Sequence, residues 1–309
     1  MKSPCSLQRF FATIALMLKH LISTQDLDDT RVLSLLDRAG AFADGFQAPN
    51  LHQRSVTALF FEHSTRTVAS FQTATARLNA HFNAFSVQTS SAKKGETLLD
   101  TLYNLQAMGI DLFVIRHHHS SALPYLAKHL ETPLINAGSG AFAHPTQALL
   151  DLLTLHRHFK GQLKGKTIAF VGDIKNSRVA NSNLQLLPRF GLKPLLVAPP
   201  HFLPKTSFEY THDLQEALEV ADIVMSLRTQ TERHSLQTYG SLQDYAYKYC
   251  LKADMLKKEV VVLHPGPVHR NIDIEDKLLS DPRCQILEQV KLGVAMRMAL
   301  IEALLSQSL

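Results

Sequence analysis

The chain has 309 residues, of which 45% are hydrophobic and 19% are charged, and its formal net charge is +5. This composition excludes a disordered or low-complexity protein, and the length suggests two domains at roughly 150 residues each. The cysteines at positions 5, 250 and 284 have no CxxC spacing and cannot all pair, so we expect free thiols and a cytoplasmic protein.

The first 17 residues are predicted to form an N-terminal extension. The apolar run from Phe10 to Leu18 is much shorter than the roughly 20 residues that span a bilayer, and no small-residue cleavage site follows it. Neither a membrane span nor export is therefore expected. Ser23 and Thr24 are predicted to cap an opening helix whose apolar residues run from Leu27 to Leu36.

Beyond this helix, short apolar runs typical of strands alternate with helical patterns. The predicted strands are Val56–Phe61, Phe82–Val87, Leu112–Arg116, Leu134–Asn136, Thr167–Gly172, Pro194–Val197, Ile223–Leu227 and Val260–His264. The predicted helices are Ser70–Leu78, Thr97–Met108, Ala122–His129, Pro145–His158, Ser177–Leu187, Leu214–Val220, Leu242–Tyr249 and Glu288–Ser306. This alternation predicts an α/β fold of two doubly wound domains, each a parallel sheet flanked by helices, with ligand sites outside the carboxyl ends of the strands.

The most informative segment runs from a predicted strand into Ser64-Thr65-Arg66-Thr67 and then into a helix. A helix N-terminus attracts anions, and hydroxyl and guanidinium groups add hydrogen bonds to phosphate oxygens. An ordinary cap with a solvent-facing arginine would explain these residues equally well. The segment by itself leaves both interpretations open.

Three further segments follow predicted strands and favour the anion site. Ser90 and the adjacent Lys93 and Lys94 lie in a polar loop, and Arg116 ends a buried strand where a charge needs a partner. The segment from His144 to Gln147 opens the next helix, with a proline suited to its first turn. Together these segments predict a cationic site with one imidazole.

This combination resembles the aspartate/ornithine carbamoyltransferase family, and the resemblance extends from about Lys19 to the C-terminus. It rests on the motifs Ser64-Thr65-Arg66-Thr67 and His144-Pro145-Thr146-Gln147, in that order. The resemblance implies a carbamoyl phosphate-binding domain of residues 18–147 plus the C-terminal helix 290–309, which packs back on it. Residues 148–289 are then expected to form the acceptor-binding domain.

The resemblance also implies the site residues. For carbamoyl phosphate they are Ser64, Thr65, Arg66, Thr67, Ser90, Arg116, His144, Gln147, Gly266 and Pro267. The catalytic set is expected to be Arg66, Thr67, Lys94, Arg116 and His144. Within these sets, Thr67, Arg116 and His144 would polarise the carbonyl oxygen, and Gln147 would hold the carbamoyl amino group.

The acceptor is predicted from the second half of the chain. Arg178 and Arg228 follow predicted strands, and arginine binds carboxylates bidentately, whereas ornithine would require carboxylates against its distal ammonium group. The resemblance places Arg178, Arg228, Gln230 and Lys94 at the aspartate-binding positions. It therefore implies the aspartate-type branch, with ornithine as the alternative acceptor.

The implied reaction transfers the carbamoyl group of carbamoyl phosphate to the α-amine of L-aspartate, giving N-carbamoyl-L-aspartate and phosphate in pyrimidine (UMP) synthesis. No metal and no organic cofactor is expected. In relatives, the residues that correspond to Ser90 and Lys94 enter the neighbouring subunit's site, which implies a homotrimer. Regulatory or dihydroorotase-like partner chains stay open, and the dispersed basic residues give no support for nucleic-acid binding.

Three local features carry separate predictions. The Gly266-Pro267 bond is predicted to be cis, as in relatives. Val68 and Gln72 replace an arginine and a glutamate one helical turn apart, and we interpret the loss of a pair worth about 0.2 to 0.5 kcal/mol as a neutral exchange. The consecutive residues 117–119, all histidines, are predicted to form a solvated loop, because neighbours on an irregular segment rarely converge on one metal ion.

Overall fold

The computed structural model describes residues 18–86, 96–229 and 241–306. The chain divides into two compact units, each with its own core. Unit 1 comprises the chain up to Leu153 and from Lys291 onward, and unit 2 comprises Thr154–Val290. The predicted extension, residues 1–17, lies outside the described ranges.

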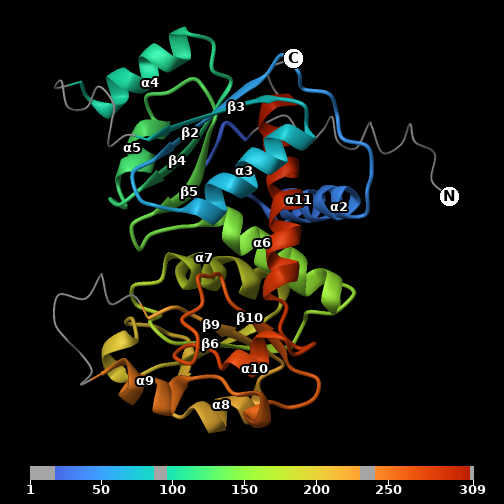
Figure 1. Cartoon of the computed structure of the whole chain (residues 1–309), viewed down its shortest axis with the longest axis vertical. Coiled ribbons are helices and arrows are strands. Elements are labelled where there is room, and N and C mark those ends of the chain that lie inside the picture. Colours follow the sequence, from blue (N-terminus) through green and yellow to red (C-terminus); the bar gives the residue numbers. More distant parts are fainter. Residues whose placement is uncertain (1–17, 87–95, 230–240, 307–309) are drawn as a thin grey trace. The chain divides into compact units, whose positions relative to one another are not determined.

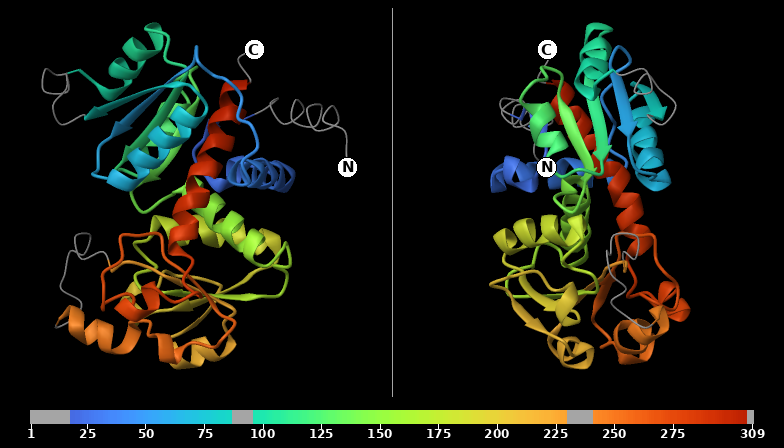
Figure 2. Two further views of the ribbon diagram at one scale, coloured as in Figure 1. Left: turned by 45° about the vertical axis from the view of Figure 1, so that its right-hand side comes forward. Right: turned by 90° about the vertical axis from the view of Figure 1, so that its left-hand side faces the viewer.

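Unit 1 is built around a five-stranded parallel sheet of order β1-β5-β4-β2-β3. Its strands are β1 (His20–Leu21), β2 (Ser55–Phe60), β3 (His81–Ser86), β4 (Leu112–His117) and β5 (Leu134–Ser139). Its helices are α2 (Asp29–Ala43), α3 (Thr65–Arg77), α4 (Leu98–Ala107), α5 (Ala122–Ala127) and α6 (Pro145–His158). Helices lie on both faces of this sheet (Figures 1 and 2), as the alternating pattern predicted.

The start of unit 1 corrects the predicted helix caps. Ser23 caps a separate 3-10 helix, η2 (Thr24–Asp26), whose Asp26 carboxylate accepts the backbone N–H groups of Ile22 and Ser23. The cap of α2 is Asp28, which accepts the N–H of Arg31 at 2.8 Å. Ser23 and Thr24 were therefore wrong as caps of the opening helix, because the Asp26 carboxylate closes a turn before that helix begins.

The last helix, α11 (Ile286–Leu305), packs against unit 1, as expected. Arg38 on α2 forms a bidentate ion pair with Glu302, in which both N–O distances are 2.6 Å. Arg297 donates to the Ser70 hydroxyl on α3 at 2.9 Å. These contacts join α11 to α2 and α3, which lie more than 200 positions earlier in the sequence (Figure 1).

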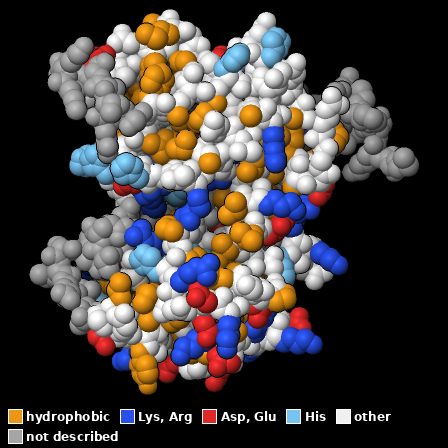
Figure 3. Space-filling model, in the orientation of Figure 1, with side chains coloured by type: hydrophobic (Ala, Val, Ile, Leu, Met, Phe, Trp, Pro, Cys, Tyr) orange, Lys and Arg blue, Asp and Glu red, His pale blue; other side chains and the backbone are white. Residues whose placement is uncertain are grey.

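Unit 2 has a second five-stranded parallel sheet, of order β10-β9-β6-β7-β8. Its strands are β6 (Thr167–Val171), β7 (Lys193–Val197), β8 (Glu209–Thr211), β9 (Ile223–Ser226) and β10 (Val261–Leu263). Its helices are α7 (Arg178–Leu186), α8 (Leu214–Val220), α9 (Leu242–Tyr249) and α10 (Asp276–Leu279), with short 3-10 helices η5 (Leu187–Phe190), η6 (Pro200–Phe202) and η8 (Ala253–Met255). Basic and acidic side chains are interspersed over the face of unit 2 seen in Figure 3.

The two strands that the sequence did not predict, β1 and β8, are both edge strands. They have only two and three residues, respectively. The residues of β8, Glu209-Tyr210-Thr211, form no apolar run, and Tyr210 is 58% exposed. Hydrogen-bonded pairing with β5 and β7 identifies β1 and β8 as strands, whereas their own residues give no strand pattern.

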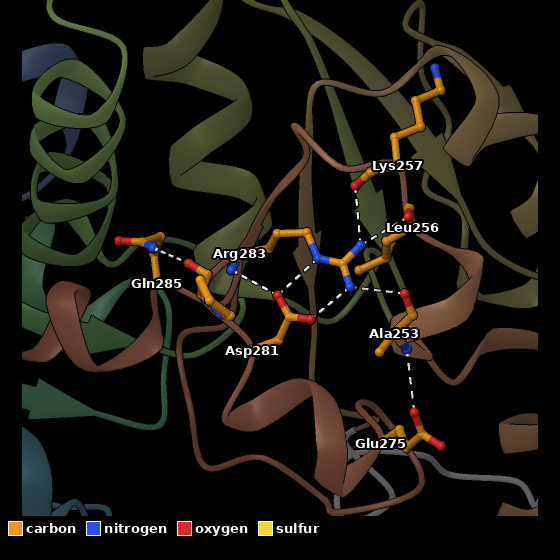
Figure 4. Close-up of polar contacts among 8 residues, drawn as sticks. Ala253, Leu256, Lys257, Glu275, Asp281, Arg283 and Gln285 are labelled. Carbon is orange, nitrogen blue, oxygen red and sulfur yellow. Dashed lines mark hydrogen bonds and ion pairs between the residues drawn. The ribbon is translucent and has the colours of Figure 1, made fainter.

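The edge strand β10 is supported by the segment around Arg283. The N–H of Val262 donates to the Arg283 carbonyl at 2.8 Å, which continues the sheet beyond its edge. The Arg283 guanidinium donates to Asp281 and to backbone carbonyls that precede β10 (Figure 4), those of Ala253, Leu256 and Lys257. Hydrogen bonds from this guanidinium lower the pKa of the Asp281 carboxyl to about 2. The cluster fixes the strand that leads to His264.

No helix within the described ranges is long and apolar enough to cross a membrane. In the same ranges, no three His, Cys, Asp or Glu side chains come together as a metal site would require. Cys250 and Cys284 are free thiols, and burial raises the pKa of Cys250 to about 11.

Candidate active site

The first cluster of site residues forms where β2 leads into α3. Ser64 is the N-cap of α3, but its hydroxyl donates to Thr67 Oγ1 at 2.9 Å instead of capping a backbone N–H group. The first turn of α3 contains no acidic residue. Thr67 is buried, whereas Thr65 and Arg66 are exposed. The N-terminus of this 13-residue helix is thus bordered by hydroxyl and guanidinium groups, which suits an anion.

Arg116 joins this cluster because of the sheet register. Phe60 at the end of β2 pairs with Arg116 on β4, so the arginine lies beside the turn that follows β2. Its Nη1 donates to the Ser64 hydroxyl at 3.4 Å, and its Nε donates to Glu62 at 3.0 Å. Glu62 supplies the partner that a charge at this sheet edge requires.

His144 and Gln147 lie at the start of α6, after β5. His117 at the end of β4 pairs with Ser139 of β5, so β5 delivers this segment beside the strand that carries Arg116. His144 is buried, and Thr146 Oγ1 lies 3.5 Å from its Nδ1, at the outer limit of a hydrogen bond. Gln147 is buried and donates from Nε2 to Asp151 Oδ1 at 2.8 Å.

Three predicted site residues, Ser90, Lys94 and Gln230, lie outside the described residues. Their roles stay predictions.

In unit 2, the predicted acceptor residues follow two neighbouring strands. β9 lies between β10 and β6, and Val171 at the end of β6 pairs with Ser226 at the end of β9. Arg178, the first residue of α7, is buried, and Arg228 is half-buried just beyond β9. Two guanidinium groups therefore follow neighbouring carboxyl ends of one parallel sheet, where ligands of such sheets bind.

A side-chain network joins Arg228 to the turn after β10. Arg228 Nε donates to His269 Nε2 at 3.2 Å, and the His269 backbone N–H donates to Asp273 Oδ2 at 2.9 Å. Asp273 Oδ2 also lies 3.3 Å from His264 Nε2, and both of these side chains are fully buried. A buried carboxylate thus connects three segments of unit 2.

The Gly266-Pro267 peptide bond is cis, which confirms the prediction. The Gly266 N–H donates to His264 Nδ1 at 2.8 Å, so this nitrogen is the acceptor of the ring and Nε2 carries the proton. His264 therefore joins the Pro265–Pro267 turn to Asp273 as a neutral imidazole.

The histidine triplet differs from its prediction. β4 extends through His117, whose pairing with Ser139 keeps it in the sheet, and its side chain is buried. His118 and His119 are exposed. A solvated loop was therefore wrong for His117, and burial lowers the pKa of its imidazole.

Several supporting residues were not predicted. Asp151 stands four residues after Gln147, so helical spacing would have revealed it. Glu62 lies within the quoted turn, but its contact with Arg116 depends on strand order. The contact of His269 with Arg228 spans 41 positions, and no local pattern indicates it.

The fold and these side chains define a class of protein, a two-domain α/β protein with cationic side chains that suit anions at the carboxyl end of each parallel sheet. Residues 19–157 match the family described as aspartate/ornithine carbamoyltransferase, carbamoyl-P binding domain. Residues 164–304 match aspartate/ornithine carbamoyltransferase, Asp/Orn binding domain. The chain belongs to the aspartate/ornithine carbamoyltransferase family.

Similar proteins support a particular branch of this family. The aspartate carbamoyltransferase catalytic subunit of Helicobacter hepaticus is 53% identical over 288 residues, which cover 92% of this chain and 97% of that protein. The Helicobacter pylori (strain ATCC 700392 / 26695) subunit is 54% identical over 300 residues, covering 93% and 98%. Aspartate transcarbamoylase from Trypanosoma cruzi, in complex with carbamoyl phosphate and aspartate, has a TM-score of 0.86 at 33% identity, covering 94% of this chain and 98% of that one.

Proposed function

We propose that this chain transfers the carbamoyl group of carbamoyl phosphate to the α-amine of L-aspartate, the reaction for which its relatives are named. The proposal rests on two observations: in unit 1, Arg116 lies beside the helix N-terminus that bears Ser64–Thr67, and in unit 2, two arginines follow strand ends. One cluster suits a phosphate and the other a dicarboxylate.

The reaction makes one bond and breaks one. The aspartate nitrogen attacks the carbonyl carbon, the carbon–oxygen bond to phosphate breaks, and the departing phosphate accepts the proton of the amine. Arg66, Arg116 and Lys94 oppose the negative charge that develops on the leaving group. Carbamoyl phosphate is held by Ser64, Thr65, Thr67 and Ser90 and by the backbone at Gly266 and Pro267. The chain therefore acts mainly by positioning and electrostatic stabilisation.

His144 is assigned the role of a donor to the carbonyl oxygen. A base beside several cations would have a lowered proton affinity, whereas an imidazole N–H stabilises the oxyanion without changing its own charge. The Thr146 hydroxyl supports this role, since donation to Nδ1 would leave the ring proton on Nε2. Thr67 and Arg116 are the other groups assigned to this oxygen.

L-Aspartate is the proposed acceptor in preference to L-ornithine. Arg178 and Arg228 suit two carboxylates, and Gln230 and Lys94 complete the proposed set. The Trypanosoma cruzi structures in complex with aspartate and with N-(phosphonacetyl)-L-aspartic acid support this choice.

The wider setting follows from the same resemblance. Residues 18–147 with the helix 290–309 would bind carbamoyl phosphate, and residues 148–289 would bind aspartate. Homotrimers in the cytoplasm would share active sites through Ser90 and Lys94 and supply N-carbamoyl-L-aspartate for pyrimidine synthesis, without a metal or an organic cofactor.

Phosphate release by the purified full chain tests the proposal. Carbamoyl phosphate is offered with L-aspartate and, in parallel, with L-ornithine. Turnover with aspartate alone is expected. Turnover with ornithine alone would contradict the proposed acceptor. If neither amine supports phosphate release, the result would favour a non-catalytic subunit that organises other enzymes.

A further inference from the structure

A network of buried polar side chains in unit 1 contacts Gln147. Gln147 and Asp151 stand one turn apart on α6, and Gln147 Nε2 donates to Asp151 Oδ1 at 2.8 Å. Asp151 is fully buried, and Gln147 is 8% exposed. An ionised carboxylate only accepts hydrogen bonds, so the amide must turn its nitrogen toward Asp151. The carbonyl oxygen Oε1 is consequently the amide atom directed away from Asp151.

Arg297 on α11 supplies a positive charge near Asp151. Both side chains are buried, and burial lowers the pKa of the Arg297 guanidinium to about 10 while the charge of Asp151 opposes that shift. The guanidinium is therefore still charged at neutral pH. An opposite charge nearby offsets the cost of burying a carboxylate.

Arg297 is itself fixed by α3 and α11. Its Nη1 donates to the Ser70 hydroxyl at 2.9 Å and to the Gly293 carbonyl at 3.0 Å, and its guanidinium lies 5.1 Å from the centre of the Phe71 ring. A Cβ atom at Gly293 would lie 2.7 Å from Nη1, so a larger residue there would displace this guanidinium. Hydrogen bonds and opposite charges thus connect Gln147 on α6 to α11 and α3.

We propose that Asp151 is a positioning residue that sets the specificity of the site for a carbamoyl group. It holds the Gln147 amide in the one orientation that presents an acceptor, Oε1, to the amino group of carbamoyl phosphate. Reversing the amide would place its oxygen against the Asp151 carboxylate, which leaves two acceptors facing each other. This inference rests on the proposed function and on the role assigned to Gln147.

The consequence is discrimination between acyl phosphates of similar shape. Acetyl phosphate carries a methyl group where carbamoyl phosphate carries an amino group. A site built to accept a hydrogen bond disfavours the analogue that lacks the donor, because its own polar atom is then left unpaired. An amide free to rotate would lose this preference, since the carbonyl oxygen would no longer be held toward the ligand.

Calorimetric titration of the full chain with carbamoyl phosphate, acetyl phosphate and inorganic phosphate tests the proposal. The wild type is expected to bind carbamoyl phosphate at least about tenfold more tightly than acetyl phosphate. In the double variant Asp151→Leu with Arg297→Met, which removes both buried charges together, the ratio should fall to within about threefold, with phosphate affinity unchanged. Arg297→Lys, which keeps the charge beside Asp151, is the matched control and should keep the wild-type ratio.

Asp151→Asn is the second test variant, because it preserves side-chain volume. Its amide can donate or accept, so Gln147 is no longer held in one orientation, and the ratio should fall at least about threefold. An unchanged ratio in a folded double variant or in Asp151→Asn would overturn the proposal, as would an equal loss of affinity for all three ligands. A wild type that binds phosphate but not carbamoyl phosphate would overturn the proposed function as well. This result differs from an unchanged ratio of carbamoyl phosphate to acetyl phosphate affinity, which would overturn only the role of Asp151.

Discussion

The two candidate binding regions hold their arginines by different means. In unit 1, Arg116 forms an ion pair with Glu62, and the two side chains are 14% and 22% exposed. In unit 2, Arg228 donates to the imidazole of His269, and the buried carboxylate of Asp273 engages the histidines. A carboxylate therefore accepts from the first arginine, whereas an imidazole ring accepts from the second.

This difference matches the ligands proposed for each region. A phosphate group carries more negative charge than one carboxylate, and it meets a helix N-terminus and several cations in unit 1. Glu62 offsets part of that positive charge. A single aspartate carboxylate is a weaker ligand, and a guanidinium whose Nε donates to an imidazole and not to a carboxylate suits it better.

The largest effect is expected from Arg116→Met. Loss of a cation at the leaving group should lower kcat/KM by about a thousandfold or more, equivalent to roughly 4 kcal/mol in the transition state. Steady-state kinetics with carbamoyl phosphate varied provides the measurement. Glu62→Gln, which removes the ion pair but keeps the cation, should stay within about tenfold of the wild type. Equal losses in the two variants would show that the ion pair matters, and not the cation.

Arg228→Met should weaken aspartate binding without changing carbamoyl phosphate binding, which distinguishes the two regions. A lost arginine–carboxylate contact is expected to raise KM for aspartate by about a hundredfold, because a charge-assisted bidentate pair contributes roughly 3 kcal/mol. Carbamoyl phosphate affinity, measured by calorimetry, should change by less than about twofold. A comparable loss of carbamoyl phosphate affinity would refute the separation.

His269 offers a smaller test on the same side. His269→Met removes the acceptor for Arg228 Nε and should raise KM for aspartate about tenfold. His269→Gln places an amide oxygen near the position of Nε2 and should restore most of the affinity, with kcat unchanged in both variants. If the methionine and glutamine variants behave alike, the hydrogen bond to Arg228 has no role in binding.

The smallest expected effect concerns stability. The pKa of Asp281 is lowered to about 2 by Arg283, so the folded state gains stability above the unfolded pKa, near 4, and loses it as pH falls toward 2. Asp281→Asn should lower the free energy of unfolding by roughly 1 kcal/mol at neutral pH, because solvent screens this partly exposed pair. Urea denaturation from about pH 7 down to pH 3 should show the gap between the two proteins narrowing. A constant gap would mean that packing, not charge, causes the difference.

The sequence predicted most of the fold because its elements are locally encoded. α6 and α8 begin and end at the predicted residues. The short edge strands β1 and β8 carry too few apolar residues for any periodicity, and only their pairing defines them. The opening cap was misassigned because two adjacent turns offered similar capping residues.

The candidate site likewise contains residues that the sequence predicts locally and contacts that it does not predict. Ser64–Thr67 and His144–Gln147 are contiguous segments at strand ends, and local sequence motifs predicted them as candidates. The groups that fix them come from elsewhere in the chain, since Arg297 is 227 positions from Ser70 and Glu62 is 54 from Arg116. Such contacts depend on which strands and helices are neighbours, and residue spacing does not contain that information.

Direct transfer between the two proposed ligands is the central claim, and labelled substrates test it most directly. Carbamoyl phosphate carrying 13C at its carbonyl carbon is mixed with 15N-labelled L-aspartate and the full chain, and the product is followed by 13C NMR. The proposed function predicts a carbonyl signal split by a one-bond coupling to 15N, together with release of phosphate. Enzyme-dependent phosphate release with no 13C–15N coupling in any product would contradict it.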